Sequence, residues 1–460
     1  MLGLSTPVVS EVHGLDWSKL PDLGAVILLA AAFASVSRRS QTPISGLWLT
    51  GWVMIALHFA ASIAMPYPGA WGTVATILCL ASLTWAGVLF ITASLPDRSH
   101  ESCRWMMACG FTVNTLYIAI LVAWPENHLA LDLAACLFAL GPLSITLASA
   151  RTYNSPPRWF LVGLYCALAV FLLAFQNRPE DGSDLALNAI LFSVYLGCCI
   201  YFIYRKRITT TGAFITFAGF LSWASVFVVA PGFAAFLPQF HLEDEVWNLP
   251  KYVVAVGMIL LLLEDQIEHN KYLALHDELT HLPNRRLFQD RLANAVVRAR
   301  RTGTHVALLL IDLDRFKQVN DTLGHHAGDV ALRQVAEILT NRTRRSDTVA
   351  RTGGDEFSII LSESTGRAEA ERVRGAVIRM LEQPLLVNGQ SVRIGASVGI
   401  AIYPEDAVAM ESLCIVADVR MYEEKQTSRS RRTADPMISE IPATFPSAKA
   451  QTGYEWNMHS

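Results

Sequence analysis

The sequence predicts two parts with different folds: an all-α bundle of transmembrane helices over residues 1–263 and an α+β domain over residues 276–433. Charged residues make up about 10% of residues 1–263 but about 26% of residues 264–460, and about a quarter is typical of soluble domains. Apolar runs of nearly transmembrane length recur through the first part. Short apolar runs that end in carboxylates or glycines mix with helical patterns in the second part.

Composition narrows the classes of protein that the chain can be. Its 460 residues are 52% hydrophobic, with a mean hydropathy of +0.34 and a formal net charge of -3. These values exclude a fully soluble enzyme and a disordered chain, and the net charge is too small to indicate a nucleic-acid partner. Among the eight cysteines, no two form a C-x-x-C pair and none has the spacing of zinc ligands. We therefore expect the cysteines to be buried as apolar side chains and to form no disulfide framework.

Nine apolar runs predict membrane-spanning helices. Lipid offers the backbone no hydrogen-bonding partner, so segments of about 20 apolar residues cross a bilayer as helices. The runs cover residues 23–37, 45–65, 70–94, 105–124, 129–149, 158–176, 185–204, 213–237 and 247–263. The first and last runs are the shortest, so an eight-span bundle remains an alternative.

The charges of the connections predict an orientation. Alternate connections are basic and contain Arg38, Arg39, Arg98, Arg104, Arg151, Arg158, Arg205, Lys206 and Arg207. The intervening connections are acidic and contain Glu126, Glu180, Asp181, Asp184, Glu243, Asp244 and Glu245. Basic connections lie on the cytoplasmic side. Nine spans then place the N-terminus outside and residues 264–460 inside, whereas eight would put those residues outside or require an inside N-terminus.

Three polar residues lie within the apolar runs: His58, Asn114 and Asn188. Such residues mark functional sites in membrane proteins, or they hydrogen-bond a neighbouring helix. We favour the second interpretation, because no pair has metal-ligand spacing and no inverted repeat of the transporter kind is found.

A linker helix is predicted after the last span. Residues 264–275 contain neither proline nor glycine, so this segment and the last span form one helix of roughly 25 residues. The helix either transmits rotation or dimer geometry to the second part or is a plain spacer.

The second part mixes strands and helices without strict alternation, which favours a mostly antiparallel central sheet. We expect a turn and the start of an amphipathic helix, a buried strand, one long helix, a strand–turn–strand unit, a further strand and a last helix. These elements cover residues 276–288, 305–314, 315–339, 347–361, 393–406 and 413–426 respectively.

Carboxylates at the ends of two of these strands indicate a cation site. Asp312 ends the buried strand, and Asp355 and Glu356 follow the turn formed by Gly353 and Gly354, which we expect to supply conformational freedom. If the two strands are neighbours, the three carboxylates converge into an oxygen-rich site that suits Mg²⁺ and substrate phosphates. Two ions about 4 Å apart would suit nucleotidyl transfer. The alternative is an acidic surface turn.

These residues resemble the GGDEF family of diguanylate cyclases. The resemblance rests on five ordered blocks, which are DELTHLPNRR (277–286), IDLDRFKQVNDTLGHHAGD (311–329), RTGGDEF (351–357), SVGIAIYPED (397–406) and ADVRMYEEK (417–425). It covers about residues 270 to 430, and five blocks in order are far more specific than one motif. It implies a nucleotide-cyclase, palm-like domain that condenses two GTP into cyclic di-GMP and two pyrophosphates.

The resemblance also implies a role for each matching residue. Asp312, the carbonyl of Leu313, Asp355 and Glu356 would hold Mg²⁺, with two ions per site and Mn²⁺ as an alternative. Asp355 would also be the general base. Asn320 and Asp329 would recognise the guanine base. The triphosphate would be contacted by Phe316, Lys317, Gly353, Gly354, Lys425 and Arg429. Each domain would bind one GTP, so the family implies a homodimer.

The family also implies a product-inhibition site. Arg344 and Asp347 have the R-x-x-D form and the usual distance from the Gly-Gly turn. Arginine suits phosphate and guanine edges, so we expect inhibition by cyclic di-GMP. The alternative is an exposed basic turn after a helix.

Some positions depart from the family pattern. His281 and Ser428 stand where glycine is usual, and Arg420 stands where a small residue is common. Ser428 weakens the phosphate role of the neighbouring Arg429, but no departure affects the metal or base positions. Residues 434–460 are predicted to be a disordered tail.

The sequence therefore predicts a cyclase that is multi-pass in a bacterial inner membrane, with the lipid bilayer, GTP and cyclic di-GMP as partners and the second part in the cytoplasm. One alternative is a catalytically silent GGDEF module that binds GTP or cyclic di-GMP as a membrane-anchored receptor. Another is a transporter with an attached regulator.

Overall fold

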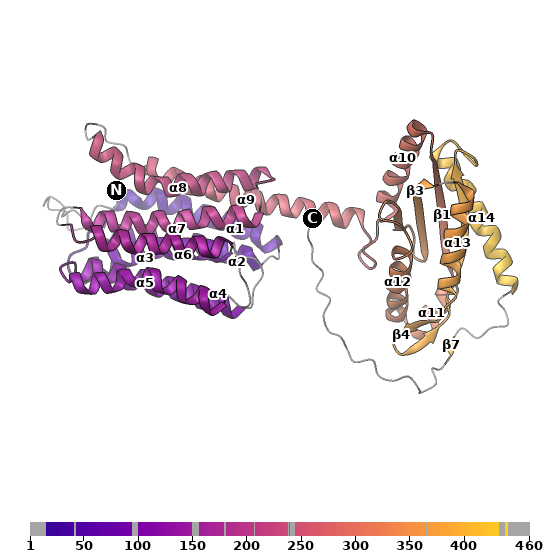
Figure 1. Cartoon of the computed structure of the whole chain (residues 1–460), viewed down its shortest axis with the longest axis horizontal. Helices are drawn as coiled ribbons and strands as arrows, with labels where there is room; N and C mark the ends of the chain where they lie inside the picture. Colours follow the sequence, from indigo (N-terminus) through magenta and orange to yellow (C-terminus); the bar gives the residue numbers. More distant parts are fainter. Residues whose placement is uncertain are drawn as a thin grey trace. The chain divides into compact units, whose positions relative to one another are not determined.

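The computed structural model describes most of the chain as two compact units, Met1–Glu268 and His269–Ser460 (Figure 1). The described residues are 15–40, 43–93, 100–149, 156–178, 181–206, 208–237, 239, 244–364, 366–431 and 438–439. Several residues used above for orientation lie outside them, namely Arg98, Arg151, Glu180, Arg207 and Glu243.

The first unit is helical, and each predicted apolar run is a helix. After a short 3-10 turn, Trp17–Lys19, the helices are α1 (Leu20–Ser40), α2 (Pro43–Ala64), α3 (Ala70–Ala93), α4 (His100–Ala123), α5 (His128–Ser149), α6 (Pro156–Phe175), α7 (Gly182–Lys206), α8 (Thr211–Phe236) and α9 (Asp244–Leu275). Within the described residues, six helices are long and apolar enough to cross a membrane: α1, α2, α3, α7, α8 and α9. The apolar stretches of α4, α5 and α6 are shorter.

Small residues let α8 and α9 approach closely. A Cβ added at Gly219 would lie 2.8 Å from the backbone nitrogen of Val254, and one at Gly257 would lie 2.5 Å from that of Thr216. Helices in lipid associate largely through such close packing. The predicted continuity of the last span and the linker is confirmed, because α9 runs unbroken over 32 residues.

The three intramembrane polar residues make different hydrogen bonds. His58 on α2 binds the carbonyl of Cys79 on α3, as expected for a contact between neighbouring helices. Asn114 and Asn188 instead donate to the carbonyl four residues earlier on their own helix. The favoured interpretation is therefore confirmed for His58 and wrong for the two asparagines, since the helix backbone already offers them an acceptor.

In the described part of the second unit there are two antiparallel sheets and five helices (Figure 1). Its elements are α10 (Arg285–Thr302), β1 (His305–Asp314), α11 (Phe316–Leu323), α12 (His325–Thr340), β2 (Thr348–Arg351), β3 (Glu356–Ser364), α13 (Arg367–Leu381), β4 (Leu385–Val387), β5 (Gln390–Val392), β6 (Gly395–Tyr403), α14 (Met410–Arg431) and β7 (Ile438–Ser439). The large sheet has the order β2-β3-β1-β6 and the small one β4-β5-β7, with antiparallel pairing throughout.

Strand β1 is central and buried on both faces. Ala307 and Leu309 face a core with α11, α12 and α13, whereas Val306 and Leu308 face a second core with α10 and α14. Side chains alternate between the two faces of a strand. Asp312 therefore lies on the α14 face, at the end of β1.

Some sequence predictions need correction. The single helix predicted over residues 315–339 is two helices, because Gly324 has φ +82°, a left-handed conformation that glycine adopts without a Cβ penalty. Helix α13 and the small sheet were not predicted. Part of the tail predicted to be disordered forms β7, which pairs with β5, and the rest of residues 434–460 lies outside the described part of the chain.

Candidate active site

The end of β1 and the Gly-Gly turn lie side by side, as predicted. Asp312 is opposite Glu356 in the β1–β3 register. The backbone nitrogen of Leu313 donates to the carbonyl of Asp355 at 3.1 Å. Asp312 and Asp355 are 43 positions apart in the sequence, and the pairing of β1 with β3 brings these two acidic residues together.

The two glycines of the turn have different roles. Neither has a left-handed φ, so the conformational freedom expected of them is not what the turn requires. A Cβ at Gly353 would lie 2.6 Å from Oε2 of Glu356, whereas nothing lies within 4 Å of one at Gly354. A side chain at Gly353 would displace the exposed Glu356 carboxylate, and the exposed Gly354 leaves the backbone open to a close ligand.

Lys425 binds Asp312 directly. Its Nζ lies 2.6 Å from Oδ1 and 2.7 Å from Oδ2 of the carboxylate, and the two side chains are 27% and 8% exposed. Only the Oδ2 contact has hydrogen-bond geometry, so the buried Oδ1 is left without a hydrogen bond. The ammonium group of α14 thus neutralises the carboxylate at the end of β1.

The carboxylates are not assembled into a metal site. Within the described residues, no group of three or more His, Cys, Asp or Glu side chains is placed to hold a metal ion. In this structure Lys425 contacts both oxygens of Asp312, and the metal site of the three carboxylates stays a prediction. The donors still fit Mg²⁺ chemically, because Asp312, Asp355, Glu356 and the Leu313 carbonyl supply only oxygen.

The candidate guanine residues come together where α11 meets α12. A Cβ at Gly328 would overlap the side chain of Asn320, so Asn320 lies against the residue that precedes Asp329. Asn320 and Asp329 are both half-buried. At the start of α11, Phe316 is buried and Lys317 is exposed.

Arg351 connects the turn to the start of the second unit, which the sequence prediction missed. Its Nη1 lies 2.9 Å from Oδ1 of Asp277, and its Nε and Nη2 donate to the carbonyl of Gly354 at 3.2 and 2.7 Å. Burial raises the pKa of the Asp277 carboxyl, but hydrogen bonds from Thr280 and Arg351 outweigh it and hold this pKa below its usual value. The position of Arg351 inside the RTGGDEF block was the sequence feature that could have indicated its role at the turn.

The R-x-x-D residues form a compact turn. Oδ2 of Asp347 accepts from the backbone nitrogen of Arg344 at 2.9 Å, and burial raises the pKa of the Asp347 carboxyl. The guanidinium of Arg344 lies 3.0 Å from Oε1 of Glu369 on α13, a buried partner that the sequence did not indicate.

The departures from the family pattern have local explanations. His281 has φ +57°, which accounts for the usual glycine at this position. Arg420 pairs with Asp406 at 2.9 Å and donates to a β6 carbonyl, so its length is used in packing α14 on the sheet. Arg429 lies on α14, but its side chain and that of Ser428 lie outside the described residues.

Comparisons with known proteins show what the second unit is similar to. Residues 274–431 match the family model described as "Diguanylate cyclase, GGDEF domain". The bifunctional diguanylate cyclase/cyclic di-GMP phosphodiesterase MucR of Pseudomonas aeruginosa is 29% identical over 384 residues, which cover 76% of this chain and 53% of that protein. Diguanylate cyclase TpbB of the same organism is 40% identical over 195 residues, which cover 40% of this chain and 45% of that protein.

The chain thus spans about half the length of these curated relatives. Among solved structures, the isolated GGDEF domain of TpbB is 41% identical, with a TM-score of 0.33, and the match covers 33% of this chain and 89% of that chain.

Proposed function

We propose that the protein is a membrane-anchored diguanylate cyclase and that residues 274–431, which match the GGDEF family model, are its catalytic domain. In each half-reaction a ribose 3′-oxygen would attack the α-phosphorus of the other GTP. A P–O bond forms, the bond to pyrophosphate breaks, and the hydroxyl proton passes to a base. Two such steps convert two GTP into cyclic di-GMP and two pyrophosphates.

The observation that carries this proposal is the hydrogen bond between the Leu313 nitrogen and the Asp355 carbonyl. It holds the proposed base, Asp355, beside the end of β1. Asp312, Glu356, Asp355 and the Leu313 carbonyl would hold Mg²⁺, with two ions per site or Mn²⁺ in their place, and the bound cations would neutralise phosphate charge. Positioning and charge neutralisation supply most of the rate acceleration in such transfers.

The substrate contacts follow from the neighbouring elements. Asn320 and Asp329 would bind the guanine edge, which the packing of Gly328 against Asn320 supports. The triphosphate would lie against the backbone of Gly353 and Gly354, with contacts from Phe316, Lys317, Lys425 and Arg429. Lys425 would leave Asp312 when a cation binds there and would then neutralise phosphate.

The two halves of the product come from two GTP, and we infer that two copies of the domain must face each other in a homodimer. The orientation predicted from the charged connections puts the domain in the cytoplasm of a bacterium, below its inner membrane, where GTP is available. Product inhibition at Arg344 and Asp347 completes the proposal, with cyclic di-GMP bound by the arginine fork.

A catalytically silent receptor is the second candidate, and one observation favours it. Lys425 neutralises Asp312 in this structure, with its Nζ 2.6 Å from the carboxylate. A domain of this kind would bind GTP or cyclic di-GMP without turnover.

The test is the product formed from GTP and Mg²⁺ by the purified full chain in lipid nanodiscs. We expect cyclic di-GMP and pyrophosphate in a 1:2 ratio from the wild type. Asp355→Ala should reduce turnover at least a thousandfold and leave GTP binding measurable, whereas Asp321→Ala, an exposed acid on α11, should match the wild type. GTP binding without product in a confirmed dimer would support the receptor instead.

A further inference from the structure

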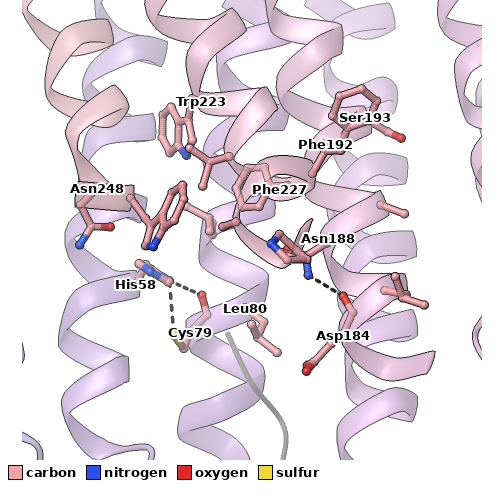
Figure 2. A pocket seen from close by; sticks show the side chains of 18 of the residues that line it. His58, Cys79, Leu80, Asp184, Asn188, Phe192, Ser193, Trp223, Phe227 and Asn248 are labelled. Atoms are coloured by element: carbon pink, nitrogen blue, oxygen red, sulfur yellow. Dashed lines mark hydrogen bonds between the residues drawn. The ribbon is translucent and has the colours of Figure 1, made fainter. Parts of the chain in front are cut away.

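A large cavity lies inside the first unit, among α2, α3, α6, α7, α8 and α9 (Figure 2). Its volume is about 1340 Å³, and small-molecule sites typically have about 300 to 1,000 Å³. Asp181 and Asp184 line it near the start of α7, and Asn248 and Lys251 line it near the start of α9. The cavity is therefore polar at one end of the helices, and an occupant would contact α9.

His58 presents a hydrogen-bond acceptor to this cavity. Its Nδ1 lies 2.9 Å from the carbonyl oxygen of Cys79, which can only accept, so Nδ1 carries the proton of this bond. A buried imidazolium in an apolar bundle is costly, so the ring is neutral and Nε2 has a lone pair. No hydrogen bond to Nε2 is formed from the described residues, and His58 is 6% exposed.

Asn188 presents a second acceptor from another helix. Its Nδ2 donates to the carbonyl of Asp184 at 2.8 Å, which identifies Oδ1 as the remaining group of the amide. Within the described part of the chain, no donor reaches this oxygen. Figure 2 shows His58 on one helix and Asn188 on another, with both side chains lining the same cavity.

Between its polar residues, the lining has an apolar and aromatic wall. Phe192, Trp223 and Phe227 line the cavity together with Leu80 (Figure 2). The indole of Trp223 is stacked on Tyr195 with a centroid distance of 4.0 Å, so this wall is held in place. Aromatic walls suit a flat ring, and the volume leaves room for an apolar chain attached to it.

We propose that the cavity binds a quinol, an aromatic ring with two hydroxyl groups and an apolar tail. One hydroxyl donates to Nε2 of His58 and the other to Oδ1 of Asn188. A hydroxyl can also accept, so it tolerates the ammonium group of Lys251 in the same lining. The shared chemistry is the aromatic hydroxyl, which a membrane quinol or a soluble phenol can supply.

The site discriminates against the oxidised ligand. A quinone has the same ring and tail, but its carbonyl oxygens can only accept, so both protein acceptors would stay unpaired. Each buried polar group left unpaired costs about tenfold in affinity or more, and tenfold corresponds to about 1.4 kcal/mol. The cavity would thus report the redox state of a membrane carrier to α9, which continues unbroken to Leu275.

The test compares decylubiquinol with decylubiquinone, which differ only in the two hydroxyl hydrogens. The full chain is placed in nanodiscs of phosphatidylethanolamine and phosphatidylglycerol without oxygen, and bound ligand is measured above that in empty discs. We expect the quinol to bind at least tenfold more tightly than the quinone. Trimethylhydroquinone, which has no tail, distinguishes the sources: weak binding indicates a membrane quinol, and equal binding indicates a soluble phenol.

Variants locate the site. His58→Phe and Asn188→Leu should each weaken quinol binding about tenfold and leave quinone binding unchanged. His58→Gln, which keeps an acceptor, should restore part of the preference. Asn114→Leu is the matched control, because Asn114 is a buried amide of α4 outside the cavity lining.

Three results would overturn the proposal: equal binding of quinol and quinone, no binding above empty discs, or an unchanged preference in both His58→Phe and Asn188→Leu. The readout is binding alone, so these results are independent of cyclase activity.

Discussion

The guanidinium of Arg351 lies 2.9 Å from the carboxylate of Asp277, and it also donates twice to the carbonyl of Gly354. Asp277 follows the end of α9 by two positions, and Asn284 nearby donates to the carbonyl of Ala274 in its last turn. One side chain therefore connects the residues after the linker helix to the proposed catalytic turn.

We expect Arg351→Lys to lower kcat about tenfold, which corresponds to about 1.4 kcal/mol. A lysine ammonium group lacks the planar fork that reaches both Asp277 and Gly354, so the turn would lose one of its two supports. Steady-state cyclic di-GMP synthesis measures the effect. Arg286→Lys, at an exposed position of the same unit, is the control, and wild-type kcat in Arg351→Lys would show that the connection does not position the turn.

Lys425→Met should increase the response of the protein to Mg²⁺ in the absence of nucleotide. Lys425 competes with a cation for the two oxygens of Asp312, so its removal leaves a buried carboxylate that a divalent ion can neutralise. We expect lower stability without Mg²⁺, by about 3 kcal/mol, and a larger Mg²⁺-induced rise in Tm than in the wild type.

Turnover by Lys425→Met should fall at the same time, because the phosphates lose a cation. Lys317→Met, at an exposed position, should leave the Tm response to Mg²⁺ unchanged. Equal Tm shifts in Lys425→Met and the wild type would mean that Asp312 is not a cation ligand.

Glu369→Gln should make product inhibition stronger. Cyclic di-GMP needs the guanidinium that Glu369 binds at 3.0 Å in this structure. Arg344 is 69% exposed, and such an ion pair contributes about 0.2 to 1 kcal/mol, so we expect the inhibition constant to fall by a factor of about 1.4 to 5. Glu371→Gln, on the same helix but paired with Arg374, should leave the inhibition constant unchanged.

Arg344→Ala should remove inhibition altogether. If inhibition is the same in Arg344→Ala and the wild type, the R-x-x-D match is accidental and the Glu369 prediction fails with it, while synthesis itself is unaffected.

Acid should destabilise the second unit through Asp406. Hydrogen bonds from Arg420 and Arg367 hold the pKa of the Asp406 carboxyl well below its usual value. Burial acts in the opposite direction but is outweighed. Because the folded pKa is lowered, this stabilisation is complete above the unfolded pKa of about 3.9 and is lost as the pH falls further. Urea unfolding of residues 269–460 between pH 3 and 7 measures it.

Asp406→Asn should lower the free energy of unfolding at pH 7 and flatten its decrease in acid. An unchanged slope below pH 4 would show that another carboxylate controls the acid transition.

The local elements were largely predictable, because their patterns depend on near neighbours. Nine apolar runs predict helices, and the short continuous apolar run of β1 with its acidic end predicts a buried strand that ends at the site. The break at Gly324 and the short strands β4 and β5 were missed, since a single left-handed residue or a three-residue strand has too weak a pattern.

The amino-acid order alone establishes which chemical groups the chain carries and where its helices and strands lie, since both depend on residues a few positions apart. It does not choose ionic or hydrogen-bonding partners. Lys425 and Asp312 are 113 positions apart, Arg351 and Asp277 are 74 apart, and each pair forms because packing brings two distant elements together. Packing also brings α2 and α7 together around their shared cavity. The physical reason is that a charge or lone pair interacts with whatever groups the folded chain places within a few ångströms.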